Sequence, residues 1–198
     1  MRRLAVALGA LAVLSAGCSD QALPEPDLSS RIEVDNAELR AFKADAKIAD
    51  CPTDPGGSSD LPDLTLPCLG GGPAVNLSEL SGPAVVQLWA SWCTSCPDEL
   101  PLFQRLAEEH GDEISVIGVD YQDTQPGAAL TLARDTGATY PQLADPGGDL
   151  ADHYKLTGLP GLLLVDAEGA VHFELNVVDD YAELRALVEQ HTGVRVDG

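Results

Sequence analysis

Short apolar runs alternate along this chain with segments in which apolar residues recur every three or four positions. The runs are short enough for buried strands, which we expect at 63–66, 83–90, 114–120, 162–165 and 171–177. The helical spacing predicts helices at 35–49, 98–110, 126–136, 149–155 and 181–191. Strands that alternate with helices, then a hairpin and a last helix, predict an α/β fold with a mixed sheet.

The start of the chain has the pattern of an exported protein. Residues 1–3 include two arginines, and the apolar stretch at 4–14 is too short to span a bilayer. The small residues that lead up to Cys18 resemble a lipoprotein signal, which predicts cleavage before Cys18 and its acylation. Such signals usually have leucine where this chain has Ser15, so an ordinary secretory signal and an uncleaved anchor stay open.

The net charge of the chain excludes some classes of binding partner. The chain has 11 Lys and Arg against 32 Asp and Glu, a formal net charge of −21. Phosphates would be repelled, which excludes nucleic-acid binding, and we expect membrane contact only through the N-terminal lipid. We interpret the acidity as a source of solubility or as life at high salt. The N-terminal pattern predicts a signal peptide at 1–17, followed by a tether and N-terminal extension with a short helix at 18–58. The length of the remaining chain predicts one domain at 59–198.

The candidate chemistry lies in Trp92-Cys93-Thr94-Ser95-Cys96, directly after the apolar run that ends at Ala90. A cysteine where a buried strand leads into a helix meets unpaired backbone N–H groups and the helix dipole, which favour its thiolate. We therefore expect Cys93 to attack or be attacked by a partner sulfur. Cys96, one turn later, would resolve the mixed disulfide. A pair of buried structural cysteines is the alternative.

Metal binding through this motif is disfavoured. Zinc ribbons need a second CxxC or a Cys/His pair, and the chain has neither. The four histidines show no ligand-like spacing: His110, His153, His172 and His191. We expect no metal and no cofactor.

At these residues the chain resembles the thioredoxin superfamily, and within it the membrane-anchored TlpA/ResA-like branch of thiol-disulfide oxidoreductases. The resemblance covers about residues 61–193. It rests on four runs: Trp89–Cys96, Glu99-Leu100-Pro101, Gly158-Leu159-Pro160 and Leu163–Gly169. It implies a thioredoxin-like fold with an inserted β-α unit between the active-site helix and Pro160.

The resemblance also implies roles for four residues around the motif. Pro160 would form a cis peptide bond against the sulfurs, with Leu159 offering backbone groups to a bound peptide; a trans proline that ends a loop is the alternative. Glu99 would be a partly buried group that tunes cysteine protonation, rather than a solvated helix residue. Trp92 would be either a packing lid beside the sulfurs or a substrate-binding residue.

Two cysteines remain, Cys51 and Cys68. An exported chain enters an oxidising compartment, where such a pair normally forms a structural disulfide. A second redox couple is the alternative, although the Pro/Gly-rich segment after Cys51 lacks the strand-to-helix context of a reactive cysteine.

The sequence thus predicts thiol-disulfide exchange on the outer face of a bacterial cell membrane. The resemblance suggests a reductant of disulfides in exported proteins, such as apocytochrome c during cytochrome c maturation, recharged by a membrane thiol-disulfide partner. Pro97 stands where the family more often has a basic or polar residue, and it leaves the direction of electron flow open. An oxidant of exported proteins is one alternative, and a copper-binding lipoprotein metallochaperone is an alternative of another class.

Overall fold

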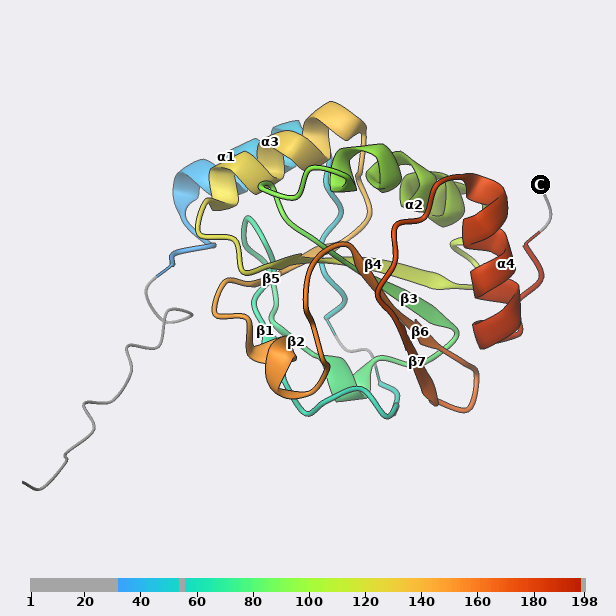
Figure 1. The fold of residues 1–198 in the computed structure, drawn as a ribbon. Helices are drawn as coiled ribbons and strands as arrows, with labels where there is room; N and C mark the ends of the chain where they lie inside the picture. Colours follow the sequence, from blue (N-terminus) through green and yellow to red (C-terminus); the bar gives the residue numbers. More distant parts are fainter. Residues whose placement is uncertain (1–31, 54–55, 197–198) are drawn as a thin grey trace, which may run out of the picture.

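The structure, a computed structural model, describes residues 32–53 and 56–196 (Figure 1). The expected signal peptide at 1–17 and acylation site at Cys18 lie outside these residues. Within the described ranges no helix is both long and apolar enough to cross a membrane. The described part has the predicted α/β fold, in which helices pack against a mixed sheet.

The centre of the fold is a five-stranded sheet in the order β5–β4–β3–β6–β7. Its strands are β3 (Ala84–Trp89), β4 (Ser115–Tyr121), β5 (Gln142–Asp145), β6 (Gly161–Val165) and β7 (Val171–Glu174). β4 runs parallel to β3 and β5 runs parallel to β4, whereas β6 is antiparallel to β3 and β7 is antiparallel to β6. The predicted mixed sheet is therefore confirmed.

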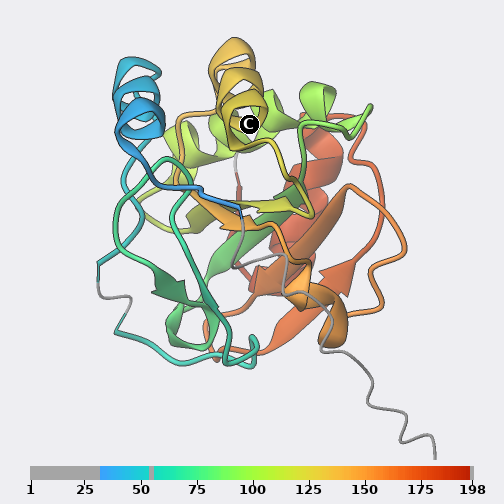
Figure 2. The same ribbon diagram turned by 90° about the vertical axis from the view of Figure 1, so that its left-hand side faces the viewer.

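The two faces of the sheet are covered differently (Figures 1 and 2). One face packs against apolar side chains from the α-helices of the described residues, which are α1 (Ala37–Asp45), α2 (Cys96–His110), α3 (Pro126–Thr136) and α4 (Tyr181–Thr192). The other face is covered by the two-stranded pair β1 (Thr65–Leu66) and β2 (Val75–Asn76) and by the 3-10 helices η1 (Leu77–Glu79) and η2 (Asp149–Asp152). Both faces of β3 are thus buried, which explains why all its residues except Gln87 are apolar.

Side-chain alternation along β3 decides what lies beneath the helices. Val85 and Trp89 belong to the cluster on the helical face, whereas Val86 and Leu88 belong to the opposite cluster. Because side chains alternate with a period of two, Gln87 lies on the helical face. The strand ends at Trp89, four residues before Cys93, so it delivers the motif to one end of the sheet.

Several elements differ from the sequence-based expectation. The first helix ends at Asp45 and not at residue 49, because Lys47 has a left-handed φ of 58° and turns the chain back. The segment at 149–155 forms only the short η2, and β7 ends at Glu174, before residue 177. The strand expected at 63–66 is shorter, and neither β2 nor β5 was predicted. β4, α3 and β5 lie between α2 and Pro160, the stretch in which the resemblance implied an inserted β-α unit.

Candidate active site

The Cys93–Cys96 pair lies at the start of α2. The two sulfurs are 2.00 Å apart and form a disulfide. A tight turn, in which the N–H of Cys93 donates to the carbonyl of Ala90, links β3 to the helix. Cys93 is 5% exposed and Cys96 is fully buried, so an incoming sulfur can reach only Cys93.

A second loop approaches the same end of the sheet. The Leu159–Pro160 peptide bond is cis, and the next residue, Gly161, pairs with Leu88 near the end of β3. Leu159 packs against the apolar cluster that contains both Cys93 and Cys96. A cavity of about 220 Å³ lies here, lined by residues 157–160 and 175–177.

Exposed apolar side chains flank this end of the molecule. Trp92 is 50% exposed, and its indole Nε1 donates to the carbonyl of Gln122 at 3.1 Å. Leu175 and Val177, which line the cavity beside Pro160, are also exposed. Of the large apolar side chains that the structure describes, these three are the exposed ones. Such a surface suits an extended peptide better than a small polar ligand.

Glu99 is a buried carboxyl group one helical turn after Cys96. Its Oε1 accepts a hydrogen bond from the backbone N–H of Val178 at 2.5 Å, while Oε2 has no hydrogen-bond partner among the described residues. Burial raises the pKa of Glu99 to about 7, and the nearby charges of Asp179 and Glu183 add to the rise. The hydrogen bond from the backbone N–H of Val178 and the side-chain amide of Gln87 oppose the shift. Glu99 is therefore not a solvated helix residue.

Gln87 is a site residue that the sequence reasoning missed. It is fully buried on β3, and its Oε1 accepts a hydrogen bond from the hydroxyl of Tyr140 at 2.5 Å. Its Nε2 has no hydrogen-bond partner among the described residues, as is also true of the Glu99 Oε2. The side-chain amide of Gln87 lowers the pKa of Glu99, although the two side chains form no hydrogen bond within the usual distance and angle limits. A single polar residue inside the apolar run 84–90 was the available signal.

Two further buried carboxyls lie behind the motif. Asp123 Oδ2 accepts from the backbone N–H of Ser91 at 2.7 Å, and its Oδ1 accepts from that of Gln125 at 2.8 Å. Asp120, at the end of β4, is buried, and desolvation together with the nearby Asp123 raises its pKa well above the usual value. These contacts tie the loop before Trp92 to the end of β4.

Cys51 and Cys68 have a different environment. Their sulfurs are 1.97 Å apart, and both residues are buried. The Nζ of the buried Lys43 lies 3.1 Å from the sulfur of Cys68 and also donates to the carbonyl of Gly71. Cys68 forms an isolated β-bridge with Leu143 of β5, so this bond fastens the N-terminal loop to the sheet edge.

Three comparisons relate the chain to known proteins. The AhpC/TSA family matches residues 58–174. The thiol:disulfide interchange protein DsbE of Allochromatium vinosum is 33% identical over 114 residues, which cover 56% of this chain and 62% of that protein. The HelX thiol:disulfide interchange protein of Rhodobacter capsulatus is 34% identical over 88 residues, 44% of this chain and 48% of that protein. The chain thus spans between about half and two thirds of these two relatives.

A solved structure is similar over a larger share of its length. The structure of MTB dsbF in its mixed oxidised and reduced forms has a TM-score of 0.59 and 29% sequence identity. The match covers 66% of this chain and 96% of that one. The similarity therefore extends through nearly the whole of that chain.

Proposed function

The chain belongs to the AhpC/TSA family, and from this premise we propose that it is a thiol-disulfide oxidoreductase whose redox pair is Cys93 and Cys96. The observation that supports this most is the disulfide at the start of α2, in which Cys93 is slightly exposed and Cys96 is fully buried. The relatives named as thiol:disulfide interchange proteins support the same chemistry.

The order of steps in the reducing direction follows from the difference in exposure between Cys93 and Cys96. The Cys93 thiolate attacks one sulfur of a substrate disulfide, a new S–S bond forms, and the other substrate sulfur leaves as a thiolate. The Cys96 thiolate then attacks Cys93, and the second substrate thiolate is released. The substrate gains two electrons and the enzyme becomes the disulfide. The oxidising direction is the reverse of these steps.

Glu99 acts through the protonation of the cysteines. A carboxyl with a pKa of about 7 can accept or release a proton at neutral pH, when the thiols gain or lose theirs. It is held by Val178 and faces the donor amide of Gln87. We assign Glu99 as a positioning residue for the proton and Gln87 as a residue that limits the rise of its pKa.

The substrates are disulfides or thiols of exported proteins. Trp92, Leu175 and Val177 give the site an exposed apolar rim, and Leu159 before the cis Pro160 offers backbone groups to an extended segment. Reduction is the preferred direction, with apocytochrome c as the candidate substrate that the sequence resemblance implies. Introduction of disulfides is the alternative within the same chemistry.

We place the protein on the extracytoplasmic face of the membrane, anchored through a lipid on Cys18. The exported-type N-terminal pattern and the Cys51–Cys68 disulfide support this location. A membrane thiol-disulfide protein would then recharge the Cys93–Cys96 pair.

Equilibration with glutathione tests both the activity and its direction. The wild-type protein is expected to exchange with the glutathione couple through Cys93–Cys96, and Cys93→Ser is expected to abolish exchange. A reduction potential below about −220 mV supports a reductant, whereas a value near about −120 mV supports an oxidant. No exchange by the wild type with glutathione or with a protein disulfide would contradict the proposal.

A further inference from the structure

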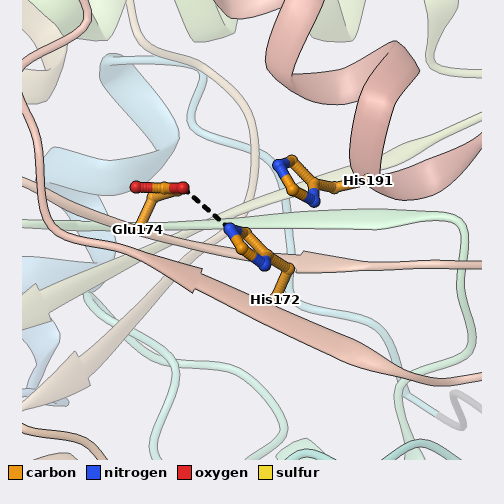
Figure 3. Close-up of side chains that lie close together, drawn as sticks. All are labelled: His172, Glu174 and His191. Carbon is orange, nitrogen blue, oxygen red and sulfur yellow. Dashed lines mark hydrogen bonds and ion pairs between the residues drawn. The ribbon is translucent and has the colours of Figure 1, made fainter.

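Two histidines that are far apart in sequence meet on the outer strand of the sheet (Figure 3). His172 lies on β7 and His191 on the last turn of α4, and their rings stack with centroids 3.6 Å apart and planes within 9°. Glu174 lies two residues after His172 on the same strand, so both side chains leave the same side. The Nε2 of His172 and the Oε1 of Glu174 are 2.7 Å apart. The three residues thus gather two imidazoles and one carboxylate.

We propose that His172, Glu174 and His191 bind a divalent first-row transition-metal ion, with Zn²⁺ or Cu²⁺ as the fitting species. One ligand atom of each residue lies within 4.8 Å of the others. Ligand bonds of about 2.0–2.2 Å place the atoms around one such ion roughly 3–4 Å apart, so the three must close by only about 1 Å. Two imidazoles and a carboxylate form a borderline donor set that suits zinc and copper, whereas calcium and magnesium prefer oxygen alone.

The side chains have the freedom that this closure needs. The His172 side chain is 41% exposed and that of Glu174 is 37% exposed, and the His191 side chain is partly exposed. In the stacked arrangement the ring lone pairs run parallel, so the ion enters when one ring rotates about its χ2 bond. The ion then takes the place of the proton between His172 and Glu174. A fourth position stays open to water, as in other sites with three protein ligands.

The site is separate from the redox pair. On β6, His172 pairs with Leu164, toward the opposite end of the strand from Pro160. The cluster also joins two elements, because His172 and Glu174 lie on the outer strand β7 and His191 lies on α4, which packs on β6. A bound ion would therefore cross-link β7 to the end of α4 and stabilise both. The acidic net charge of the chain favours a cation at its surface.

Titration calorimetry with ZnCl₂ tests the proposal on the chain as isolated, without a histidine tag, with both disulfides closed and free thiols alkylated. We expect one-to-one binding, tighter binding of Cu²⁺ than of Zn²⁺, and none of Mg²⁺. His172→Ala, His191→Ala and Glu174→Gln are each expected to weaken Zn²⁺ binding at least about tenfold, since losing even a second-shell partner costs 10- to 100-fold. His153→Ala and Glu168→Gln, at exposed positions outside the cluster, are the matched controls.

A second readout identifies the ligands directly. Zn²⁺ is expected to shift the ring signals of His172 and His191 in NMR spectra, to leave those of His110 and His153 in place, and to raise the melting temperature of the wild type but not of His191→Ala. Absence of Zn²⁺ binding to the wild type would overturn the proposal. So would equal affinity in the wild type and the three variants, or shifts confined to other histidines. None of these outcomes bears on disulfide exchange, so this proposal and the proposed function fail independently.

Discussion

The backbone N–H of Val178 donates a 2.5 Å hydrogen bond to Oε1 of Glu99, and so joins two residues that are 79 positions apart. This bond connects the active-site helix α2 to the segment between β7 and α4. Its partner oxygen, Oε2, has no hydrogen bond among the described residues. Because only one donor is close enough to bond to the charged form, burial dominates and the pKa of Glu99 rises to about 7.

Glu99 is expected to make stability depend on pH. Its pKa is near 4.5 in an unfolded chain and about 7 in the folded one, so the folded state holds the proton more strongly. The free energy of unfolding contributed by Glu99 is therefore greatest below pH 4.5 and falls as the pH rises to 7. The free energy of unfolding of Glu99→Gln, relative to that of the wild type, should therefore increase over this range by on the order of 2–3 kcal/mol.

Urea denaturation at a series of pH values measures this difference. Glu108→Gln, an exposed position on the same helix, serves as the control and should show no such trend. A constant difference between Glu99→Gln and the wild type from pH 4.5 to pH 8 would show that the carboxyl titrates normally.

Gln87 is expected to hold the pKa of Glu99 down. Gln87→Leu removes the amide donor, so the pKa of Glu99 should rise above about 7. The variant also leaves the Tyr140 hydroxyl without its acceptor, at a cost of about 1–3 kcal/mol in stability. A carboxyl ¹³C NMR titration of Glu99 gives its pKa directly. Tyr140→Phe is the control, because it removes the hydroxyl and keeps the amide; an unmoved midpoint in Gln87→Leu would refute the assignment.

The charge of Glu99 is expected to oppose formation of the Cys93 thiolate. Glu99→Gln should shift the pH profile of Cys93 alkylation to lower pH, by about one unit or less, because a neighbouring negative charge disfavours a thiolate. Disulfide exchange should slow where proton transfer limits its rate. Asp98→Asn is the matched control, since that carboxylate is exposed and its field is screened. An unchanged profile in Glu99→Gln would separate this carboxyl from the redox chemistry.

The two disulfides are expected to differ in their resistance to reductant. Cys51 and Cys68 are buried and close a loop with a sequence separation of 17, so replacing both by alanine should cost about 3 kcal/mol of stability. Differential alkylation followed by peptide mapping, with increasing dithiothreitol, should open Cys93–Cys96 first. Reduction of both pairs at the same concentration would contradict a purely structural role.

Much of the fold follows from local pattern. The apolar runs that became β3, β4 and β6 are buried on both faces, and the helical spacing gave α3 at Pro126–Thr136. β5 was not predicted from the sequence because its end residues are polar. Its Gln142 accepts from the indole of Trp89, and its Asp145 accepts from three backbone N–H groups at the start of η2. Those partners exist only in the folded chain.

The candidate site also contains both residues that the sequence predicts and contacts that it does not. The CxxC motif and the proline loop are local runs of sequence, so their residues could be named in advance. The bond from Val178 to Glu99 and the stacking of His172 on His191 join distant segments through the order of the strands. The spacing of residues along the chain therefore does not predict these two contacts. The sequence positions of His172 and His191 show no ligand-like spacing, so the sequence did not predict that the fold brings this pair together.

The most direct test of the redox assignment is to trap the mixed disulfide. Cys96→Ser removes the resolving sulfur, so the variant should accumulate a covalent adduct with a glutathione or protein disulfide, and mass spectrometry should locate the new bond at Cys93. Cys93→Ser should form none, because Cys96 is fully buried. We expect one adduct per chain, at Cys93. No adduct with Cys96→Ser, or equal trapping in both variants, would contradict it.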